Sequence, residues 1–383
     1  EINLGTFQEN PGDSYTKESV VSGSAVKKSM IVPLIGAVAL PVLILFILPE
    51  AIDLVWWCFI LAALLSIPIV IFGFVYRWMH SDEGFLRVLG KFVSPVPPGM
   101  IYGSDLKTLG FPIATLSLIA ANTILYFITP DEIVNQLCFL PYSDLNLAHV
   151  ILTTVTCAFF HADFGHLFGN MVFLWAFGAA LEPRLGSARY LIIYLLCSVI
   201  SSLICLNLLV VQVIAFDDPL LILQYSSLGA SGVISGLTGL FVVRCYFARL
   251  SFSLPFYTSP LFSVPVRVNS IVLIGMFFAT DLAGSVEQLT DAGVMIDYWG
   301  HVGGFIGGVA LGLIFKLQNE GYREAREVKA ERLAKAEGGT AAASEIYKEV
   351  LERDPQNLNA LRHFLKLNRY NSEKEGEYFS RLI

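Results

Sequence analysis

The sequence predicts an all-α, polytopic membrane protein, and its composition and the length of its apolar runs carry this prediction. The 383 residues are 55% hydrophobic and 15% charged, whereas a soluble domain carries about 25% charged residues. The apolar residues gather in runs of roughly 20, the length that an α-helix needs to cross a bilayer. A soluble globular domain is therefore excluded.

Eight runs meet this criterion, and two of them form an N-terminal pair. Residues 30–48 and 54–76 are separated by only five residues, which predicts a transmembrane hairpin. After a polar connector come the other six runs: 111–128, 166–181, 190–216, 231–247, 270–284 and 298–315.

The basic residues indicate how the runs are oriented. Lys and Arg occur before the first run, on alternate sides of the later ones and after residue 315, whereas the loops 129–165, 217–230 and 285–297 contain neither. Because Lys and Arg concentrate in cytoplasmic loops, we expect both termini to be cytoplasmic. The chain starts with a polar stretch and no signal-like apolar segment, so a bacterial plasma membrane is favoured.

Composition shifts divide the chain into five parts. We expect a polar segment at 1–29, the hairpin at 30–76, a cytoplasmic connector at 77–110, a membrane core at 111–317 and a charged helical tail at 318–383. In the tail, the spacing of Ala343, Tyr347, Val350 and Pro355 fits half of a tetratricopeptide repeat. A plain amphipathic helix pair explains it equally well. Either would offer a surface to a cytoplasmic protein partner.

Cysteine and histidine usage argues against metals and disulfides. Most of the six cysteines lie inside apolar runs and none forms a CxxC pair, so we expect buried apolar side chains. His161 and His166 are five residues apart, which does not place them on one helix face as a zinc pair requires. We expect no metal, no cofactor and no nucleic-acid partner.

Polar residues inside the runs are the candidates for function, because each costs a few kcal/mol, on the order of 3, to insert. They are His161, His166 and Asn170 at the start of the fourth run, Ser231 at the start of the sixth, and His301 at the start of the last. Each follows a loop without Lys or Arg, so all are expected at one membrane depth on the non-cytoplasmic side.

Each of these residues alone has an ordinary structural explanation. Ser231 and Ser235 follow the small-xxx-small pattern of closely packed helices, and the series Gly304, Gly308 and Gly312 extends such a face beyond His301. The same glycines would let the helix of His301 approach the helix of Ser231. A role of these small residues in helix packing is therefore compatible with a catalytic role of Ser231 and His301.

Together the polar residues suit acyl transfer. A serine hydroxyl becomes a nucleophile when a base within hydrogen-bond reach takes its proton, and His301 offers that base. Asn170 lies four residues after His166, on the same helix face, and both could donate to a developing oxyanion. Gly232 and the free N–H groups of a helix that starts after Ser231 would add further donors.

Four separated motifs resemble the rhomboid family of intramembrane serine proteases over residues 110–317. "HADFGHLFGNM" resembles its H-x4-H-x3-N signature, "GAALEPRLGSARYL" its Glu-x-Arg segment, "GASG" its nucleophile motif and "GHVGGFIGG" its H-x2-G-x3-G motif. The four occur in the order found in the family. The resemblance implies a six-helix core with a Ser–His dyad.

The resemblance also implies roles. Ser231 would be the nucleophile, His301 the base, and His166 and Asn170 the oxyanion hole with the Ser231 N–H. The supporting residues would be His161, which braces the first outer loop, Gly229 and Gly232 of the nucleophile motif, and Glu182 and Arg184 in a cytoplasmic-side network. The helix at 270–284, with Phe277 and Phe278, would match a mobile gate for substrate.

The sequence departs from the family pattern in ways that leave one question open. Ser235 stands where the family often has an aromatic residue that stacks on the catalytic histidine, and the Trp-Arg pair common in the first outer loop is absent. How His301 is held is thus unexplained. Asp281, within the seventh run, is the one group that does not fit neatly with the clustering of polar residues at one side of the membrane.

The sequence thus predicts a serine endopeptidase that cleaves transmembrane segments of other membrane proteins near the outer face of the bilayer. Helical substrates would need Gly, Ala or Pro to loosen the bonds that occupy their carbonyls. The alternative is a non-catalytic relative that binds transmembrane helices, although such proteins typically lack the serine or histidine. A transporter is a third interpretation, and it would place polar groups across the whole membrane.

Overall fold

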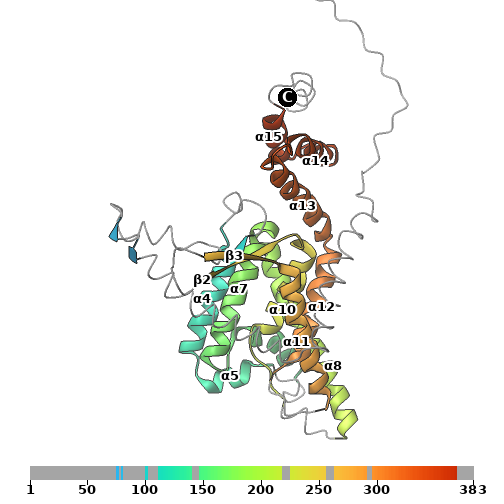
Figure 1. Ribbon diagram of the computed structural model, residues 1–383. Coiled ribbons are helices and arrows are strands. Elements are labelled where there is room, and N and C mark those ends of the chain that lie inside the picture. The colour runs from blue at the N-terminus through green and yellow to red at the C-terminus, as the bar shows by residue number, and fades with distance from the viewer. Residues whose placement is uncertain are drawn as a thin grey trace, which may run out of the picture. The chain divides into compact units, whose positions relative to one another are not determined.

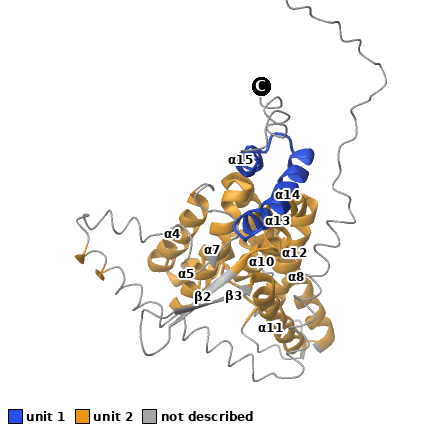
Figure 2. Cartoon of the chain, turned by 45° about the horizontal axis from the view of Figure 1, so that its top comes forward, with its two compact units in different colours: residues 1–29, 329–383 blue, residues 30–328 orange. Residues whose placement is uncertain are grey.

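The computed structural model describes residues 75–76, 79–80, 100–101, 111–139, 146–217, 225–255, 263–290 and 296–368 (Figure 1). The predicted segment at 1–29 and nearly all of the predicted hairpin at 30–76 and of the connector at 77–110 lie outside these residues. The chain divides into a larger compact unit, 30–328, and a smaller one, 1–29 with 329–383 (Figure 2).

The larger unit is built from helices, as predicted. They are α4 (Ile113–Ile128), α5 (Asp131–Leu137), α6 (Leu147–Thr156), the short 3₁₀ helix η2 (Cys157–Phe159), α7 (Phe164–Leu185), α8 (Ser187–Phe216), α10 (Ser231–Arg244), α11 (Ser270–Thr290) and α12 (Tyr298–Ile314). α13 (Leu317–Ala334) begins in this unit and ends in the smaller one. Six of these helices coincide with the six predicted runs after the hairpin.

A small antiparallel sheet is present that we did not predict. Its strands are β1 (Met100–Ile101), β2 (Arg249–Pro255) and β3 (Ser263–Asn269), in the order β1-β2-β3. Arg249 pairs with Asn269 and Pro255 with Ser263. Apolar residues alternate along both longer strands, the period of a β-strand, but these segments are short beside the apolar runs that flank them.

Three helices are long and apolar enough to cross a membrane by themselves: Phe164–Leu185, Ser187–Ala215 and Ser270–Leu289. The helix pair formed by α12 and α13 meets the test jointly, although the chain bends by 80° between them. α10 is shorter, and its 14 residues extend about 21 Å at 1.5 Å per residue. This is less than the thickness of the bilayer core, about 30 Å. If the C-terminal end of α10 lies at one boundary of the core, the first residue of α10 therefore lies inside the core, short of the other boundary.

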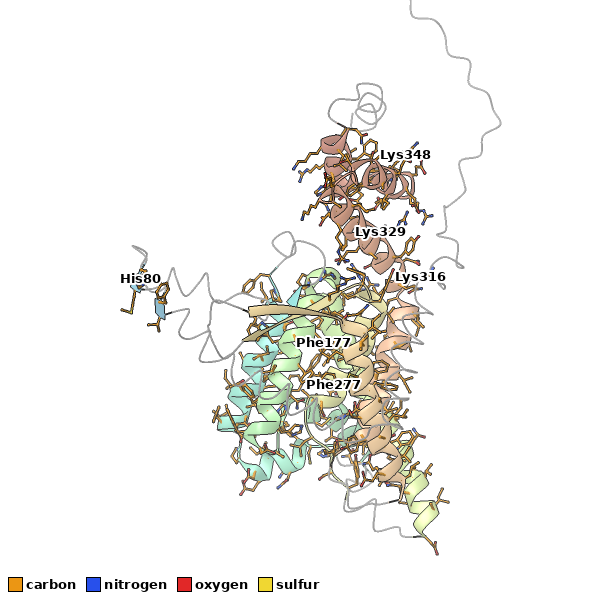
Figure 3. All side chains as sticks on the ribbon, viewed as in Figure 1. His80, Phe177, Phe277, Lys316, Lys329 and Lys348 are labelled. Carbon is orange, nitrogen blue, oxygen red and sulfur yellow. The ribbon has the colours of Figure 1, made fainter. Side chains whose placement is uncertain are left out.

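α10 is the central helix of the larger unit. It packs against α7, α8, α11 and α12, most extensively against α12. Leu237, Leu240 and Val243 along it are fully buried. Phe241 of α10 meets Phe177 of α7 edge to face, with ring centroids 5.3 Å apart, and Figure 3 shows Phe177 and Phe277 inside this unit. Side chains of α10 therefore lie among those of four neighbouring helices.

Glycines bring α10 and α12 into backbone contact. A methyl group on Gly304 would overlap the carbonyl of Gly232, and one on Gly308 would overlap the carbonyl of Gly236. Gly312 lies against Val243, where an added methyl group would come within 2.9 Å of the side chain. The prediction that these glycines form a packing face is confirmed.

Gly308→Ala is expected to destabilise the helical unit by about 2 to 3 kcal/mol, because the new methyl group meets backbone that cannot rotate away. Gly169→Ala on α7 is the matched control, since a methyl group there meets nothing within 4 Å and alanine favours the helix by roughly 0.5 to 1 kcal/mol. Unfolding of both variants in detergent, followed by circular dichroism, measures the difference. Equal midpoints for the two variants would contradict the account of this interface.

The smaller unit contains the end of α13 with α14 (Thr340–Arg353) and α15 (Leu358–Leu367). Its core includes Tyr347, Val350, Leu361 and Phe364, while Figure 3 labels Lys329 and Lys348 on this unit. Three of the four residues in the predicted repeat pattern, Ala343, Tyr347 and Val350, are thus buried. One helix pair fits either interpretation of the tail, and both stay open.

Candidate active site

The residues singled out in the sequence lie at the beginnings of three helices. His166 is the third residue of α7, Ser231 the first of α10 and His301 the fourth of α12. Side chains cap two of these helices: the Asp163 carboxylate accepts from the N–H of His166 at the start of α7 (2.9 Å), and the Asp297 carboxylate accepts from the N–H of Gly300 at the start of α12 (2.8 Å). The start of α10 adjoins the other two, since Gly229 lies against His166 and Gly232 lies near the carbonyl of Gly300.

The loop before Ser231 is fastened on three sides. Ser227 and Phe139 exchange backbone hydrogen bonds (2.8 and 3.1 Å), and the N–H of Gly229 donates to the carbonyl of Cys157 (2.9 Å). The Ser227 hydroxyl donates to the Asp297 carboxylate (3.0 Å). The loop therefore connects the start of α12 with the segments on the other side of α10.

His166 and Asn170 lie directly over Gly229. Gly229 has φ of +125°, a conformation that favours glycine, and a methyl group there would come within 2.6 Å of His166 Cε1 and 3.6 Å of Asn170 Nδ2. The Nδ2 of Asn170 is buried and has no hydrogen-bond partner within the described residues. A buried amide without an acceptor is costly, and it is free here for a ligand.

His161 contacts the same turn from the loop before α7. Its Nε2 lies 3.4 Å from the N–H of Ala230, which donates to it, and its ring meets that of His166 edge to face at 5.2 Å. Burial lowers the pKa of His161 to about 3, so the imidazole is neutral and its Nε2 can accept. No side chain caps the start of α10, which leaves the first N–H groups of that helix directed at this region.

Ser231 and His301 lie on the two helices with the closest backbone contact, but no hydrogen bond joins them within the part of the chain described. The residues beside them interlock: a methyl group on Gly232 would lie 3.5 Å from the carbonyl of Gly300, and the Ser235 hydroxyl donates to the carbonyl of His301 (2.8 Å). The two helices are thus in contact at the level of Ser231 and His301.

His301 is held without an aromatic residue at position 235. Its Nδ1 hydrogen-bonds to Asp281 Oδ1 at 2.9 Å, from α11, and Tyr298 meets its ring edge to face at 6.2 Å. Asp281 is the single carboxylate in the apolar run 270–284, and this feature of the sequence could have marked it as a functional residue. Asp281 and Tyr298 thus hold the His301 ring, although position 235 has no aromatic residue to stack on it.

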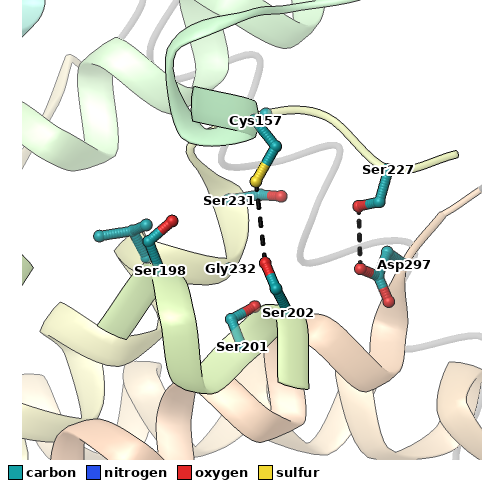
Figure 4. Close-up of a pocket in the computed structure, with 10 residues that line it drawn as sticks. Cys157, Ser198, Ser201, Ser202, Ser227, Ser231, Gly232 and Asp297 are labelled. Carbon is teal, nitrogen blue, oxygen red and sulfur yellow. Dashed lines mark hydrogen bonds between the residues drawn. The ribbon is translucent and has the colours of Figure 1, made fainter. Parts of the chain in front are cut away.

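A small polar cavity adjoins Ser231 (Figure 4). Its volume is about 20 Å³, enough for one water molecule. Hydroxyl groups of α8 form much of its wall, and Ser202 contacts Cys157 at 3.8 Å there. The lining residues are Cys157, Ser198, Ser201, Ser202, Ser227, Gly229, Ser231, Gly232, Val233 and Asp297.

Glu182 and Arg184 lie at the other end of α7. The Glu182 carboxylate accepts from the backbone N–H groups of Ala114 and Thr115 at 2.8 and 2.7 Å, and so caps the start of α4. Arg184 pairs with Glu324 of α13 (2.6 Å), as does Arg244 (2.7 Å). These two residues stand apart from the serine and take part in packing.

Two aromatic contacts hold α11 in place. Phe277 meets Phe173 of α7 edge to face at 5.2 Å, and Phe278 stacks on Phe305 of α12 at 4.2 Å. Within the described residues, no group of three or more His, Cys, Asp or Glu side chains could hold a metal ion. The arrangement thus offers a hydroxyl, an imidazole and amide donors for chemistry.

Fold and site define a class: an integral, multi-pass helical membrane protein with a serine and a histidine on adjacent helices. Residues 148–318 match the model of the Rhomboid domain. This match supports the resemblance to the rhomboid family that the four motifs carry.

Curated relatives agree with this. The chain is 29% identical over 175 residues to Rhomboid protein 1, mitochondrial, of Saccharomyces cerevisiae, covering 46% of this chain and 45% of that protein. It is 29% identical over 157 residues to Rhomboid protease GluP of Bacillus subtilis, covering 40% and 24%. Rhomboid-like protease 3 of Toxoplasma gondii is 26% identical over 157 residues, covering 41% and 49%. The chain spans less than half the length of each relative.

Proposed function

We propose that the protein is an intramembrane serine endopeptidase that uses Ser231 as nucleophile and His301 as general base. The observation that carries this proposal is the Gly229–Ser231 turn, which lies under His166 and the unpartnered Nδ2 of Asn170. Free donors beside a serine at a helix start suit a tetrahedral oxyanion. The motifs and the named proteases among the relatives support the same reaction class.

In the proposed mechanism, Ser231 Oγ attacks a substrate carbonyl carbon while the Nε2 of His301 takes its proton. The carbonyl oxygen becomes an oxyanion and accepts hydrogen bonds from Asn170, His166 and the Ser231 N–H. The protonated His301 then gives its proton to the leaving amine as the C–N bond breaks. A water molecule, for which the cavity beside Ser231 has room, would hydrolyse the acyl-enzyme with His301 again as base.

The proposed substrates are transmembrane segments of other membrane proteins. Ser231 lies at the start of a helix too short to span the bilayer core, on the side that follows loops without Lys or Arg. Cleavage is therefore proposed near the non-cytoplasmic face, at Gly, Ala or Pro residues that release carbonyls from helical hydrogen bonds. The distribution of Lys and Arg supports cytoplasmic termini in a bacterial plasma membrane.

Reconstitution in lipid vesicles with a single-span model substrate tests this function. The proposal predicts two fragments whose new ends, identified by mass spectrometry, fall within the outer part of the transmembrane segment. The alternative of a non-catalytic helix-binding relative predicts that the intact substrate co-purifies with the chain and no fragment forms. That second outcome would overturn the proposal.

Asn170→Ala is expected to lower kcat by about 10²- to 10³-fold, the usual loss for one oxyanion donor. Because Asn170 Nδ2 has no partner among the described residues, its removal should leave stability nearly unchanged. Steady-state cleavage and the unfolding midpoint are both measured. A variant that retains the wild-type kcat would show that Asn170 takes no part in catalysis.

A further inference from the structure

We infer that Asp281 is a positioning residue for His301, so that the proposed dyad works with a third member supplied by α11. This inference rests on the proposed function and deepens it. The Asp281 carboxylate would accept a hydrogen bond from the Nδ1–H of His301 and so leave Nε2 free to take the serine proton.

The contact between the two side chains is direct and largely sheltered. Oδ1 of Asp281 lies 2.9 Å from Nδ1 of His301, and the two side chains are 20% and 18% exposed. Within the described residues, His301 is the only side chain that hydrogen-bonds to this carboxylate. A carboxylate can only accept, so the shared proton belongs to Nδ1 and the lone pair to Nε2.

The contact is built into the interface between α11 and α12. Phe278 stacks on Phe305 (4.2 Å) on one side of it, and Trp299 Nε1 donates to the carbonyl of Ser285 (2.8 Å) on the other. As the residue numbers rise along α11 they fall along α12, so the helices run antiparallel and Asp281 meets His301 in the middle of the contact. Three successive contacts fix the register.

A carboxylate within an apolar membrane helix is energetically unfavourable unless it has a partner. Asp281 stands in the apolar stretch "MFFATDLAG", and α11 contains no Lys or Arg. A charged side chain within a membrane helix costs about 2.5 to 3.5 kcal/mol even on insertion scales. Within the described residues this carboxylate accepts from one side-chain donor, the Nδ1–H of the histidine proposed as the base.

The proton transfers of the proposed mechanism define what the Asp281 carboxylate does. When Nε2 takes the proton of Ser231, the imidazole becomes a cation, and the adjacent carboxylate stabilises it without taking a proton itself. When Nε2 gives its proton to the leaving amine, the imidazole becomes neutral again, and its Nδ1–H still donates a hydrogen bond to Asp281. The carboxylate thus selects the tautomer in both steps.

The position of α11 becomes part of the active-site geometry. Asp281 and His301 lie on different helices, and the hydrogen bond exists only while α11 packs against α12. The helix that resembles the substrate gate in the family is therefore also the helix that orients the base.

The rate at which a small fluorophosphonate labels Ser231 tests this inference, because the reagent reports activation of the serine without needing a transmembrane substrate. Asp281→Asn is nearly isosteric, but its amide can donate to Nδ1 and favour the wrong tautomer. We expect the labelling rate to fall by about 10²- to 10⁴-fold. For a cleaved substrate, kcat should fall while KM stays close to that of the wild type.

Two further variants separate positioning from structure. Asp281→Glu keeps the acceptor and should recover at least about tenfold of the rate lost in Asp281→Asn. Thr280→Val on the same helix removes a hydroxyl that bonds only to the carbonyl of Phe277 within the described residues, and should label at the wild-type rate.

Folded Asp281→Asn protein that labels at the wild-type rate would overturn the inference. So would equal losses in the Asn and Glu variants accompanied by a lower unfolding midpoint, since that pattern indicates a purely structural role. A wild-type protein that neither labels nor cleaves would instead overturn the proposed function, and the two failures are therefore distinguishable.

Discussion

Ser231→Ala abolishes cleavage of a single-span substrate and leaves the protein folded. The expected loss in kcat is on the order of 10⁴-fold or more, since removing a serine nucleophile eliminates the covalent route and leaves only oxyanion stabilisation and binding. Ser231 is half-buried and its hydroxyl makes no hydrogen bond among the described residues, so the unfolding midpoint should hardly change. Fragment formation in vesicles is the measurement.

Thr238→Val is the matched control for this variant. Thr238 is also on α10, and its hydroxyl donates to the carbonyl of Ser235 within the helix (2.8 Å). Loss of that hydroxyl should leave cleavage at the wild-type level. Undiminished cleavage by Ser231→Ala would exclude Ser231 as the nucleophile.

His301→Ala is expected to be as inactive as Ser231→Ala, because the serine proton then has no acceptor. The two losses should not add: the double variant Ser231→Ala, His301→Ala should cleave at the same residual rate as either single variant, as groups that act as a unit do. Steady-state cleavage of the three proteins in parallel measures this.

His301→Ala also leaves the Asp281 carboxylate without its partner, which is expected to lower stability. Asp281→Asn in the same background should restore stability and leave activity absent. If His301→Ala retained more than a few per cent of wild-type cleavage while folded, another base would have to serve Ser231.

Much of the fold and the placement of the polar residues could be predicted from sequence. The charge pattern of the loops predicted that His166, Ser231 and His301 lie at one depth, and in the structure the start of α10 adjoins the starts of α7 and α12. Helix length and loop charge are local properties, which is why a single sequence reveals them.

The contacts between helices could not be predicted in the same way. The hydrogen bond from His301 to Asp281 joins residues 20 positions apart across a loop, and it depends on the register of α11 against α12. Ser235 lacks the expected aromatic ring yet holds the backbone of His301 instead. The sheet of β1, β2 and β3 was missed because its strands are short beside long apolar runs.

Mass spectrometry of the protein after reaction with a fluorophosphonate in lipid vesicles tests whether Ser231 is the nucleophile. We expect one modified serine, Ser231, and loss of the adduct in His301→Ala. An adduct on a different serine, or cleavage of a transmembrane substrate by protein in which Ser231 stays unmodified, would contradict this assignment.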